Sequence, residues 1–211
     1  MPAVSAIVLS GGKSKRLGED KALLMLDGEP LLARTIRSMG ALSDDLIVVT
    51  NHPQSHRAAA WPARLVPDET PGLGSLVGVY SGLKACRHPK AIVVACDMPF
   101  LSVPLLRYMV PLSRGYDVVI PRRGRFLEPL HAIYGRTCLP AIERVLASGR
   151  RRIVAFFDAA KVRFVEEEEV STFDPHHLSF LNVNTLEDWE LIKGHAARRG
   201  EDSSASELAC R

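Results

Sequence analysis

The sequence predicts an α/β protein of three layers, in which helices cover both faces of a mostly parallel sheet. Short apolar runs rich in β-branched residues alternate with stretches of helical spacing along nearly the whole chain. One of these runs, residues 91–95, is continuously apolar, as expected of a central strand covered on both faces. Polar residues and glycines follow several of the runs. In a parallel sheet these positions meet at one edge, where α/β proteins bind their ligands.

The strands are predicted from apolar runs that end at turn-forming residues. We expect strands at residues 4–9, 46–50, 64–66, 91–95, 118–120, 162–165 and 180–185.

The helices are predicted from apolar spacing and from residues that suit helix ends. We expect helices at residues 31–39, 76–86, 103–109, 139–147, 153–158 and 186–193. Pro30 suits the start of the first helix, Ser102 suits the N-cap of the third, and Gly149 follows the end of the fourth. Thr185 and Asp188 have the spacing of a capping box for the last helix.

Length and composition indicate one globular domain. The chain has 211 residues, of which 46% are hydrophobic, and residues 1–195 are expected to form a single domain. Residues 196–211 are charged and rich in small side chains, so we expect a disordered tail. The run of four glutamates at 166–169 is interpreted as a solvated face.

Charge and hydropathy exclude several partners. The net charge of +3 is small, and the basic residues are not interleaved with aromatics, so no nucleic-acid partner is predicted. No apolar run approaches the roughly 18 residues that cross a bilayer, and no signal peptide precedes the first strand. We expect a cytoplasmic protein with no membrane partner.

The cysteines are expected to be free thiols, because no C-x-x-C pair is present. Cys86 and Cys96 are interpreted as core residues.

The first strand leads into a loop suited to binding phosphate. Ser10, Gly11 and Gly12 allow the backbone N–H groups to approach an anion. Positive charge surrounds them at Lys13, Lys15, Arg16 and Lys21. The loop is not a P-loop, which would need a glycine in place of Ile7, and the spacing to Gly18 does not fit the dinucleotide fingerprint.

The string L-S-G-G-K-S-x-R-L-G-x-D-K-A-L-L and the polar turn at 27–31 resemble a family signature. The signature is that of the NTP-transferase superfamily, and the similarity is greatest to the MobA-type molybdenum cofactor guanylyltransferases, whose loop reads L-A-G-G-x-S-x-R-M-G-x-D-K. Ser10 replaces the usual alanine and Leu17 the usual methionine. The resemblance covers about residues 4–193 and implies a three-layer, Rossmann-like nucleotidyltransferase fold. It implies GTP and molybdopterin as substrates, Mg²⁺ as cofactor, and molybdenum-cofactor insertion and delivery proteins as possible partners. The nucleotide-binding residues that we expect are Leu9, Ser10, Gly11, Gly12, Lys13, Lys21, Asn51, Asp68 and Asp97.

Two polar residues follow the second and third strands. Asn51 is a candidate base or ribose contact, although an asparagine before His-Pro is equally common in a plain turn. Asp68 matches the family's acidic position before a glycine-rich loop. A carboxylate there can accept both hydrogen bonds from the N1–H and N2–H₂ edge of guanine.

Asp97 is the predicted metal ligand. It follows the central apolar strand, and Mg²⁺ typically takes one or two carboxylates together with substrate phosphates and waters. The string C-D-M-P-F-L resembles the family's metal-binding motif. An alternative role as a helix cap does not fit, because Ser102 already suits that position.

The acceptor-side candidates come from the later part of the chain. In the resembling family the region of Arg122 and Arg123 faces a phosphorylated pterin, although a solvated basic hairpin tip is an equal alternative. Asn182 and Asn184 belong to an N-x-N-T-x-E-D string whose asparagines lie beside the family's active site. The P-L-x-A-x-Y string at 129–134 matches a family strand, and its His131 is interpreted as structural.

The predicted reaction is attack of the molybdopterin phosphate on the α-phosphorus of GTP, with release of pyrophosphate. Lys21, Arg16 and Asp97 are the predicted catalytic residues, acting by positioning and charge neutralisation. Three alternatives stay open: a cytidylyltransferase for the same cofactor, a nucleotidyltransferase for a sugar or polyol phosphate, and a nucleotide-binding cofactor-delivery protein without turnover.

Overall fold

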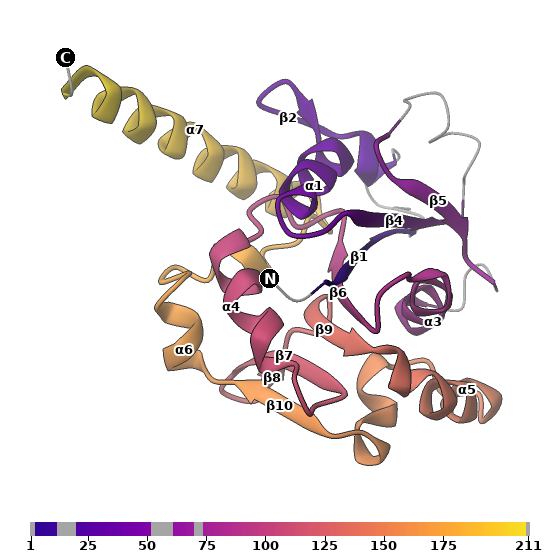
Figure 1. The fold of residues 1–211 in the computed structure, drawn as a ribbon. Helices are drawn as coiled ribbons and strands as arrows, with labels where there is room; N and C mark the ends of the chain where they lie inside the picture. The colour runs from indigo at the N-terminus through magenta and orange to yellow at the C-terminus, as the bar shows by residue number, and fades with distance from the viewer. Residues whose placement is uncertain (1–2, 12–19, 52–60, 70–73, 210–211) are drawn as a thin grey trace.

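The computed structural model describes residues 3–11, 20–51, 61–69 and 74–209, with side chains up to residue 198. These residues form an eight-stranded sheet in the order β10-β7-β9-β6-β1-β4-β5, with the short β8 paired to β7 (Figure 1). The strands are β1 (Ser5–Ser10), β4 (Asp45–Thr50), β5 (Arg64–Pro67), β6 (Lys90–Ala95), β7 (Val118–Arg123), β8 (Phe126–Leu127), β9 (His131–Gly135) and β10 (Val162–Val165). β9 runs antiparallel to β6 and β7, whereas β1, β4, β5 and β6 pair in parallel. The mostly parallel α/β sheet predicted from the sequence is confirmed.

The helices cover both faces of the sheet, as the three-layer prediction requires (Figure 1). The α-helices are α1 (Leu31–Gly40), α3 (Ser75–Ala85), α4 (Val103–Leu112), α5 (Leu139–Ala147), α6 (Glu167–Ser171) and α7 (Leu186–Ala209). The 3₁₀ helices are η1 (Lys21–Leu23), η2 (Arg136–Cys138), η3 (Ile153–Ala159) and η4 (Leu178–Phe180). None of the helices in the described part of the chain combines the length and apolar character that a bilayer crossing needs.

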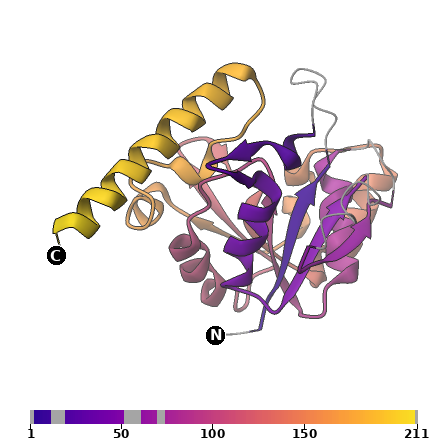
Figure 2. The ribbon, with the colours of Figure 1, turned by 90° about the horizontal axis from the view of Figure 1, so that it is seen from above.

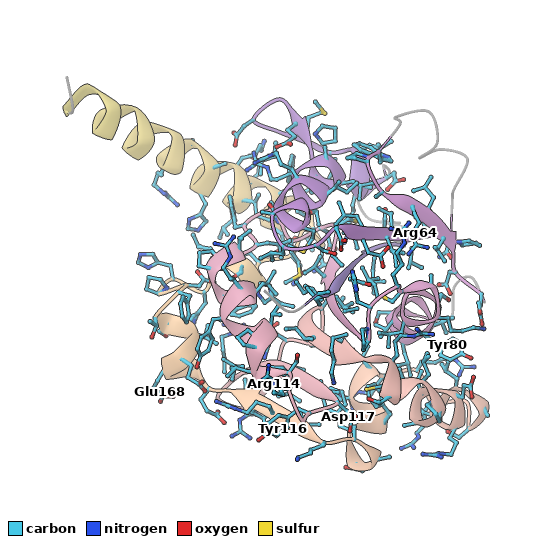
Figure 3. All side chains as sticks on the ribbon, viewed as in Figure 1. Arg64, Tyr80, Arg114, Tyr116, Asp117 and Glu168 are labelled. Carbon is cyan, nitrogen blue, oxygen red and sulfur yellow. The ribbon has the colours of Figure 1, made fainter. Side chains whose placement is uncertain are left out.

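Strand β1 supplies both halves of the core, because its side chains alternate between the two faces. Ala6 and Val8 belong to a cluster with residues of α1 and α4, while Ile7 and Leu9 belong to a cluster with residues of α3 and α5. On the latter face the hydroxyl of Tyr80 on α3 donates a hydrogen bond to a carboxylate on α5 (Figure 3). β1 is therefore held in the middle of the three layers.

A third, smaller cluster fixes the beginning of α7. It joins Ile192 and Ala196 of α7 to Leu26 and Phe100. Leu26 lies on a two-stranded hairpin, β2 (Met25–Leu26) and β3 (Glu29–Pro30), which the sequence analysis treated as a plain turn. α7 lies on the opposite side of the molecule from β5 (Figures 1 and 2).

Two predictions for the end of the chain differ from the structure. Residues 180–185 do not form a strand, because Val183 is buried in the third cluster and its N–H bonds outside the sheet ladder, to the carbonyl oxygen of Asp97 at 3.0 Å. The tail predicted to be disordered at 196–211 continues α7 as far as Ala209. Alanine, glutamate and arginine in this stretch have high helix propensity, and Ala196 is buried.

The glutamate run at 166–169 is also not a plain solvated face. Glu166 and Glu169 form a capping box at the start of α6. Glu169 further accepts hydrogen bonds from Tyr108 at 2.7 Å and from Arg163 at 2.8 Å. These bonds attach α6 to α4 and to the edge strand β10.

The cysteine predictions hold for the residues described. Cys86, Cys96 and Cys138 are buried free thiols, and Cys210 lies outside the described residues. Burial raises the pKa of the Cys96 thiol to about 12, so it stays protonated and unreactive at neutral pH.

Candidate active site

The carboxyl ends of β1, β4, β5 and β6 surround a cavity of about 770 Å³. Parallel strands end at the same edge, so the polar residues that follow each strand face a common space. Eight predicted site residues line this cavity: Leu9, Ser10, Gly11, Lys21, Asn51, Asp68, Asp97 and Asn184. Gly12, Lys13 and Arg16 lie outside the described residues.

The centre of the site is an ion pair between Lys21 and Asp97. The Nζ atom of Lys21 lies 3.1 Å from Oδ2 of Asp97 and donates a second hydrogen bond of 2.9 Å to Oδ1 of Asn184. The side chains of Lys21 and Asp97 are only 17% and 19% exposed. A cation is therefore held in a fixed place inside a cavity that is open to a ligand, which is an arrangement suited to binding phosphate.

Short-range structure fixes both members of this pair. Lys21 begins η1, whose N-cap Asp20 accepts a hydrogen bond of 3.0 Å from the N–H of Ala22. Asp97 follows β6, where Cys96 donates a backbone hydrogen bond of 3.0 Å to the carbonyl oxygen of Leu9. Asp97 is thus tied to the two central strands of the sheet, and Lys21 is held by η1.

Asn51 and Asp68 lie on the β4–β5 side of the cavity. A Cβ atom on Gly11 would lie 3.3 Å from Nδ2 of Asn51, so this glycine lets the asparagine side chain approach the loop after β1. The Oδ1 atom of Asn51 is buried and has no hydrogen-bond partner among the described residues. The N–H of Asp68 lies 3.4 Å from the carbonyl oxygen of Thr50. This side of the cavity therefore offers side-chain oxygens as hydrogen-bond acceptors.

The N-terminus of α3 opens onto the same cavity. Gly74, the N-cap, has φ of 93°, a conformation that favours glycine, and it lines the cavity together with Ser75 and Gly78. The helix N-terminus presents N–H groups and a positive partial charge to the cavity. Close packing of α3 on β1 makes this possible, because Cβ atoms on Gly78 and Gly82 would lie 3.2 Å and 2.7 Å from side-chain atoms of Leu9 and Ile7.

Comparison with known proteins identifies the family. Residues 6–164 match the family described as the MobA-like NTP transferase domain. The chain belongs to this family. A molybdenum cofactor guanylyltransferase from Desulfosudis oleivorans is 39% identical over 199 residues, which cover 93% of this chain and 96% of the relative. A probable molybdenum cofactor guanylyltransferase from Pelotomaculum thermopropionicum is 35% identical over 188 residues, 89% of this chain and 91% of the relative.

Structural comparison agrees with the family. The crystal structure of molybdopterin-guanine dinucleotide biosynthesis protein A from Archaeoglobus fulgidus superposes with a TM-score of 0.81 at 26% identity, over 92% of this chain and 100% of that one. The resemblance predicted from the phosphate loop is confirmed. As a member of the MobA-like NTP transferase family, the chain is a nucleotidyltransferase.

Not every predicted acceptor-side residue of this MobA-like chain meets the cavity. Among the described residues that line it, Asn184 is present, while Asn182, Arg122 and Arg123 are not. The Nδ2 of Asn182 instead donates to the carbonyl oxygen of Phe180 at 3.0 Å.

The two arginines brace a β-hairpin. Arg122 and Arg123 lie beyond the strand predicted at 118–120, but β7 continues through Arg123, and the chain turns at Gly124 into β8. Arg122 pairs with Glu166 at 2.6 Å, and Arg123 pairs with Glu128 at 2.5 Å. Both arginines are therefore paired residues at the end of a strand and not a solvated hairpin tip, and a role toward the acceptor stays a prediction.

Sequence reasoning missed several lining residues of this MobA-like site. They are Asp20, Val49, Thr50, Gly74, Ser75, Gly78, Ala95, Cys96 and Leu130. Three of them, Asp20, Thr50 and Cys96, lie next to a predicted residue. Thr50 and Cys96 lie at or just after a strand end, which could have indicated them. Leu130 precedes β9, and only the antiparallel pairing of β9 with β6 brings it to this edge.

Proposed function

We propose that the chain transfers GMP from GTP to the terminal phosphate of molybdopterin, which releases pyrophosphate and forms the guanine dinucleotide cofactor. The observation that carries the proposal is the Lys21–Asp97 pair inside the cavity at the sheet edge, in a chain of the MobA-like family. Relatives that match along about 90% of this chain carry the name molybdenum cofactor guanylyltransferase, some of them as probable members, and this supports the choice of donor and acceptor.

The strand order supports one orientation of the substrates. β1 lies between β6, which leads to Asp97, and β4, which leads to Asn51. In the proposal the guanine base lies toward Asn51 and Asp68, and the phosphates lie over the loop after β1 and beside Lys21. The acceptor enters from the β9 side, where Leu130 and Asn184 line the cavity.

The proposed chemistry is an in-line substitution at the α-phosphorus. An oxygen of the acceptor phosphate forms the new P–O bond while the bond to the pyrophosphate oxygen breaks. The acceptor phosphate is already ionised at neutral pH, so no side chain has to remove a proton. Lys21 holds the phosphates and neutralises the charge that develops on the leaving pyrophosphate, and Arg16 is proposed to assist it.

The carboxylates that line the cavity are suited to binding a divalent cation. Asp97 offers a carboxylate to the cavity, and Asp20 and Asp68 line the same cavity. No group of three metal-binding side chains was found among the described residues. Mg²⁺ does not need such a group, since it is commonly held by one or two carboxylates with substrate phosphates and waters. We propose Asp97 as its ligand, and when bound the ion would supply charge neutralisation at the phosphates.

The preference for guanine is proposed to rest on acceptor oxygens. Guanine presents two adjacent donors, N1–H and N2–H₂, whereas cytosine presents a donor beside an acceptor. The carboxylate of Asp68 and the buried Oδ1 of Asn51 are suited to two donors. A site built for donors discriminates strongly, because a wrong base leaves the buried Oδ1 of Asn51 unpaired.

The test is an assay of pyrophosphate release with molybdopterin and Mg²⁺, in which GTP, CTP, ATP and UTP are supplied separately. We expect release with GTP and formation of the guanine dinucleotide, and no release without the acceptor. Release with CTP alone would overturn the assignment of the base, and release with none of the four would overturn the proposed function. Chelation of the metal should abolish turnover, and activity that survives chelation would refute the metal assignment.

A further inference from the structure

The loop before α7 reaches the active site through a single polar side chain. Oδ1 of Asn184 accepts the 2.9 Å hydrogen bond from Nζ of Lys21, and Lys21 in turn lies 3.1 Å from Asp97. Asn184 lies outside any strand or helix. Its position therefore depends on the few hydrogen bonds that hold residues 181–185.

One of those bonds ties the loop to β6. The N–H of Val183 donates to the carbonyl oxygen of Asp97 at 3.0 Å, and the Val183 side chain is fully buried. This bond fixes the backbone just before Asn184, but it does not by itself fix the peptide groups that follow Val183.

Asp188 supplies the second tether. Its Oδ2 atom accepts hydrogen bonds of 2.9 Å from the N–H groups of both Asn184 and Thr185. The N–H of Asp188 donates at 3.1 Å to Oγ1 of Thr185 and completes the predicted capping box. A capping box needs only the bond to Thr185, so the bond to Asn184 goes beyond what is required to start the helix.

The carboxylate of Asp188 is well suited to accepting hydrogen bonds from the N–H groups of Asn184 and Thr185. Burial raises its pKa, but hydrogen bonds from Asn184 and Thr185 and the nearby charge of Lys21 outweigh that effect and lower the pKa below its usual range. The group is ionised at neutral pH, and charge-assisted hydrogen bonds of this kind are strong. The helix behind it is anchored by Ile192 and Ala196 in the third core cluster.

We infer that Asp188 is a positioning residue for the transfer reaction, which holds Asn184 so that Asn184 and Asp97 together orient the amine of Lys21. This inference rests on the proposed function in assuming that Lys21 acts on the phosphates. Asp188 touches no substrate in this account, and the inferred route of its action is the hydrogen bond to Asn184.

The experiment compares two variants that damage the same capping box. Asp188→Ala removes both hydrogen bonds to the loop, whereas Thr185→Ala removes only the bond that caps the N–H of Asp188. We expect both to lower the melting temperature. Only Asp188→Ala should lower kcat, by about 10- to 100-fold, the scale for a small misplacement of a reacting group. KM for GTP should change less than kcat, because the proposed contacts to the base are untouched. Asp188→Asn, which keeps one acceptor oxygen, should fall between wild type and Asp188→Ala.

A double-mutant cycle tests the route of the effect. If Asp188 acts through Asn184, kcat of the double variant Asp188→Ala/Asn184→Ala should equal that of Asn184→Ala alone. The inference would be overturned if the loss of kcat in the double variant equalled the product of the losses in the two single variants. An equal loss of kcat in Thr185→Ala and Asp188→Ala would also overturn it.

Failure of the proposed function can be distinguished from failure of the positioning role of Asp188. If wild type does not turn over GTP with molybdopterin, the proposed function fails, and the cycle is then run with the nucleotide that wild type does use. Side-chain amide NMR signals of ¹⁵N-labelled Asn184 provide a readout without turnover. They should shift in Asp188→Ala and stay in place in Thr185→Ala, and unchanged signals in both would refute the positioning role.

Discussion

The close packing of α3 on β1 can be tested with one glycine. A Cβ atom on Gly82 would lie 2.7 Å from Cγ2 and 2.8 Å from Cδ1 of Ile7, a side chain that is fully buried. Overpacking of a core costs about 1–3 kcal/mol, whereas alanine in place of glycine inside a helix gains about 1 kcal/mol. Gly82→Ala should therefore lower the free energy of unfolding by up to about 2 kcal/mol.

Gly194 in α7 provides a matched control. A Cβ atom there meets no heavy atom within 4 Å, so Gly194→Ala should only gain the helix propensity, about 1 kcal/mol. The difference between the two variants isolates the overpacking cost. In a domain of this size it corresponds to melting temperatures that differ by roughly 3–9 °C. Thermal and urea unfolding measure both variants. If Gly82→Ala proves as stable as Gly194→Ala, the contact between α3 and β1 is not as close as described.

The remaining predictions concern the site and a buried histidine. Lys21→Ala should lower turnover by about 10²–10³-fold, the scale for one preorganised electrostatic contact. Lys161→Ala removes an equal charge from an exposed position and should leave turnover unchanged. Turnover is measured as pyrophosphate release, and a near-normal value in Lys21→Ala would remove Lys21 from the mechanism. Asp97→Asn should lose nearly all activity, with only partial recovery in a titration with excess Mg²⁺, and full activity would contradict the metal assignment. Burial lowers the pKa of His131 to about 4 from 6.5, and neither ring nitrogen has a partner among the described residues. The unfolded chain therefore binds the proton more readily between these pH values, and the free energy of unfolding should fall by about 3 kcal/mol as the pH drops from 6.5 to 4. Urea unfolding across this range should show less of that loss in His131→Phe, and an equal loss in both proteins would show that another group is responsible.

The sequence was most informative where local chemistry and burial agree. The strand predicted at 91–95 is β6 without its first residue, because a run of apolar residues with no polar face can only be central. The helix predicted at 139–147 matches α5 in both bounds, since Gly149 follows its end. The N-cap role of Ser102 is also confirmed, as its hydroxyl accepts a hydrogen bond from the N–H of Leu105.

The predictions were wrong where one sequence pattern is compatible with two different backbone arrangements. Leu181 and Val183 alternate with asparagines as they would in a strand, yet they pack in the third cluster without ladder partners. The alternation records which side chains are buried, and it does not specify what the backbone bonds to. Similarly, a run of glutamates gives no sign that arginines distant in sequence will pair with it, as Arg122 does with Glu166.

Eight of the residues that line the cavity could be predicted, but the contacts between them could not. Asp97 and Lys21 were found because each follows a strand or a glycine-rich loop. Their contact with Asn184, which is 163 residues from Lys21, depends on how α7 docks. No local pattern encodes that docking, because it arises from apolar packing between Leu26 and Ile192.

The order of the strands places the residues proposed for base choice and those proposed for transfer on opposite sides of β1. Asn51 and Asp68 follow β4 and β5 on one side of β1, while Asp97 follows β6 on the other, and Lys21 and Asn184 lie next to Asp97. Within the part of the chain that the structure describes, the Lys21 amine is hydrogen-bonded to Asp97 and Asn184 and not to β4 or β5. Substitutions of Asn51 or Asp68 should therefore change which nucleotide is bound and leave the orientation of Lys21 intact. Base choice can then vary within this architecture without rebuilding the part of the site that carries out the transfer.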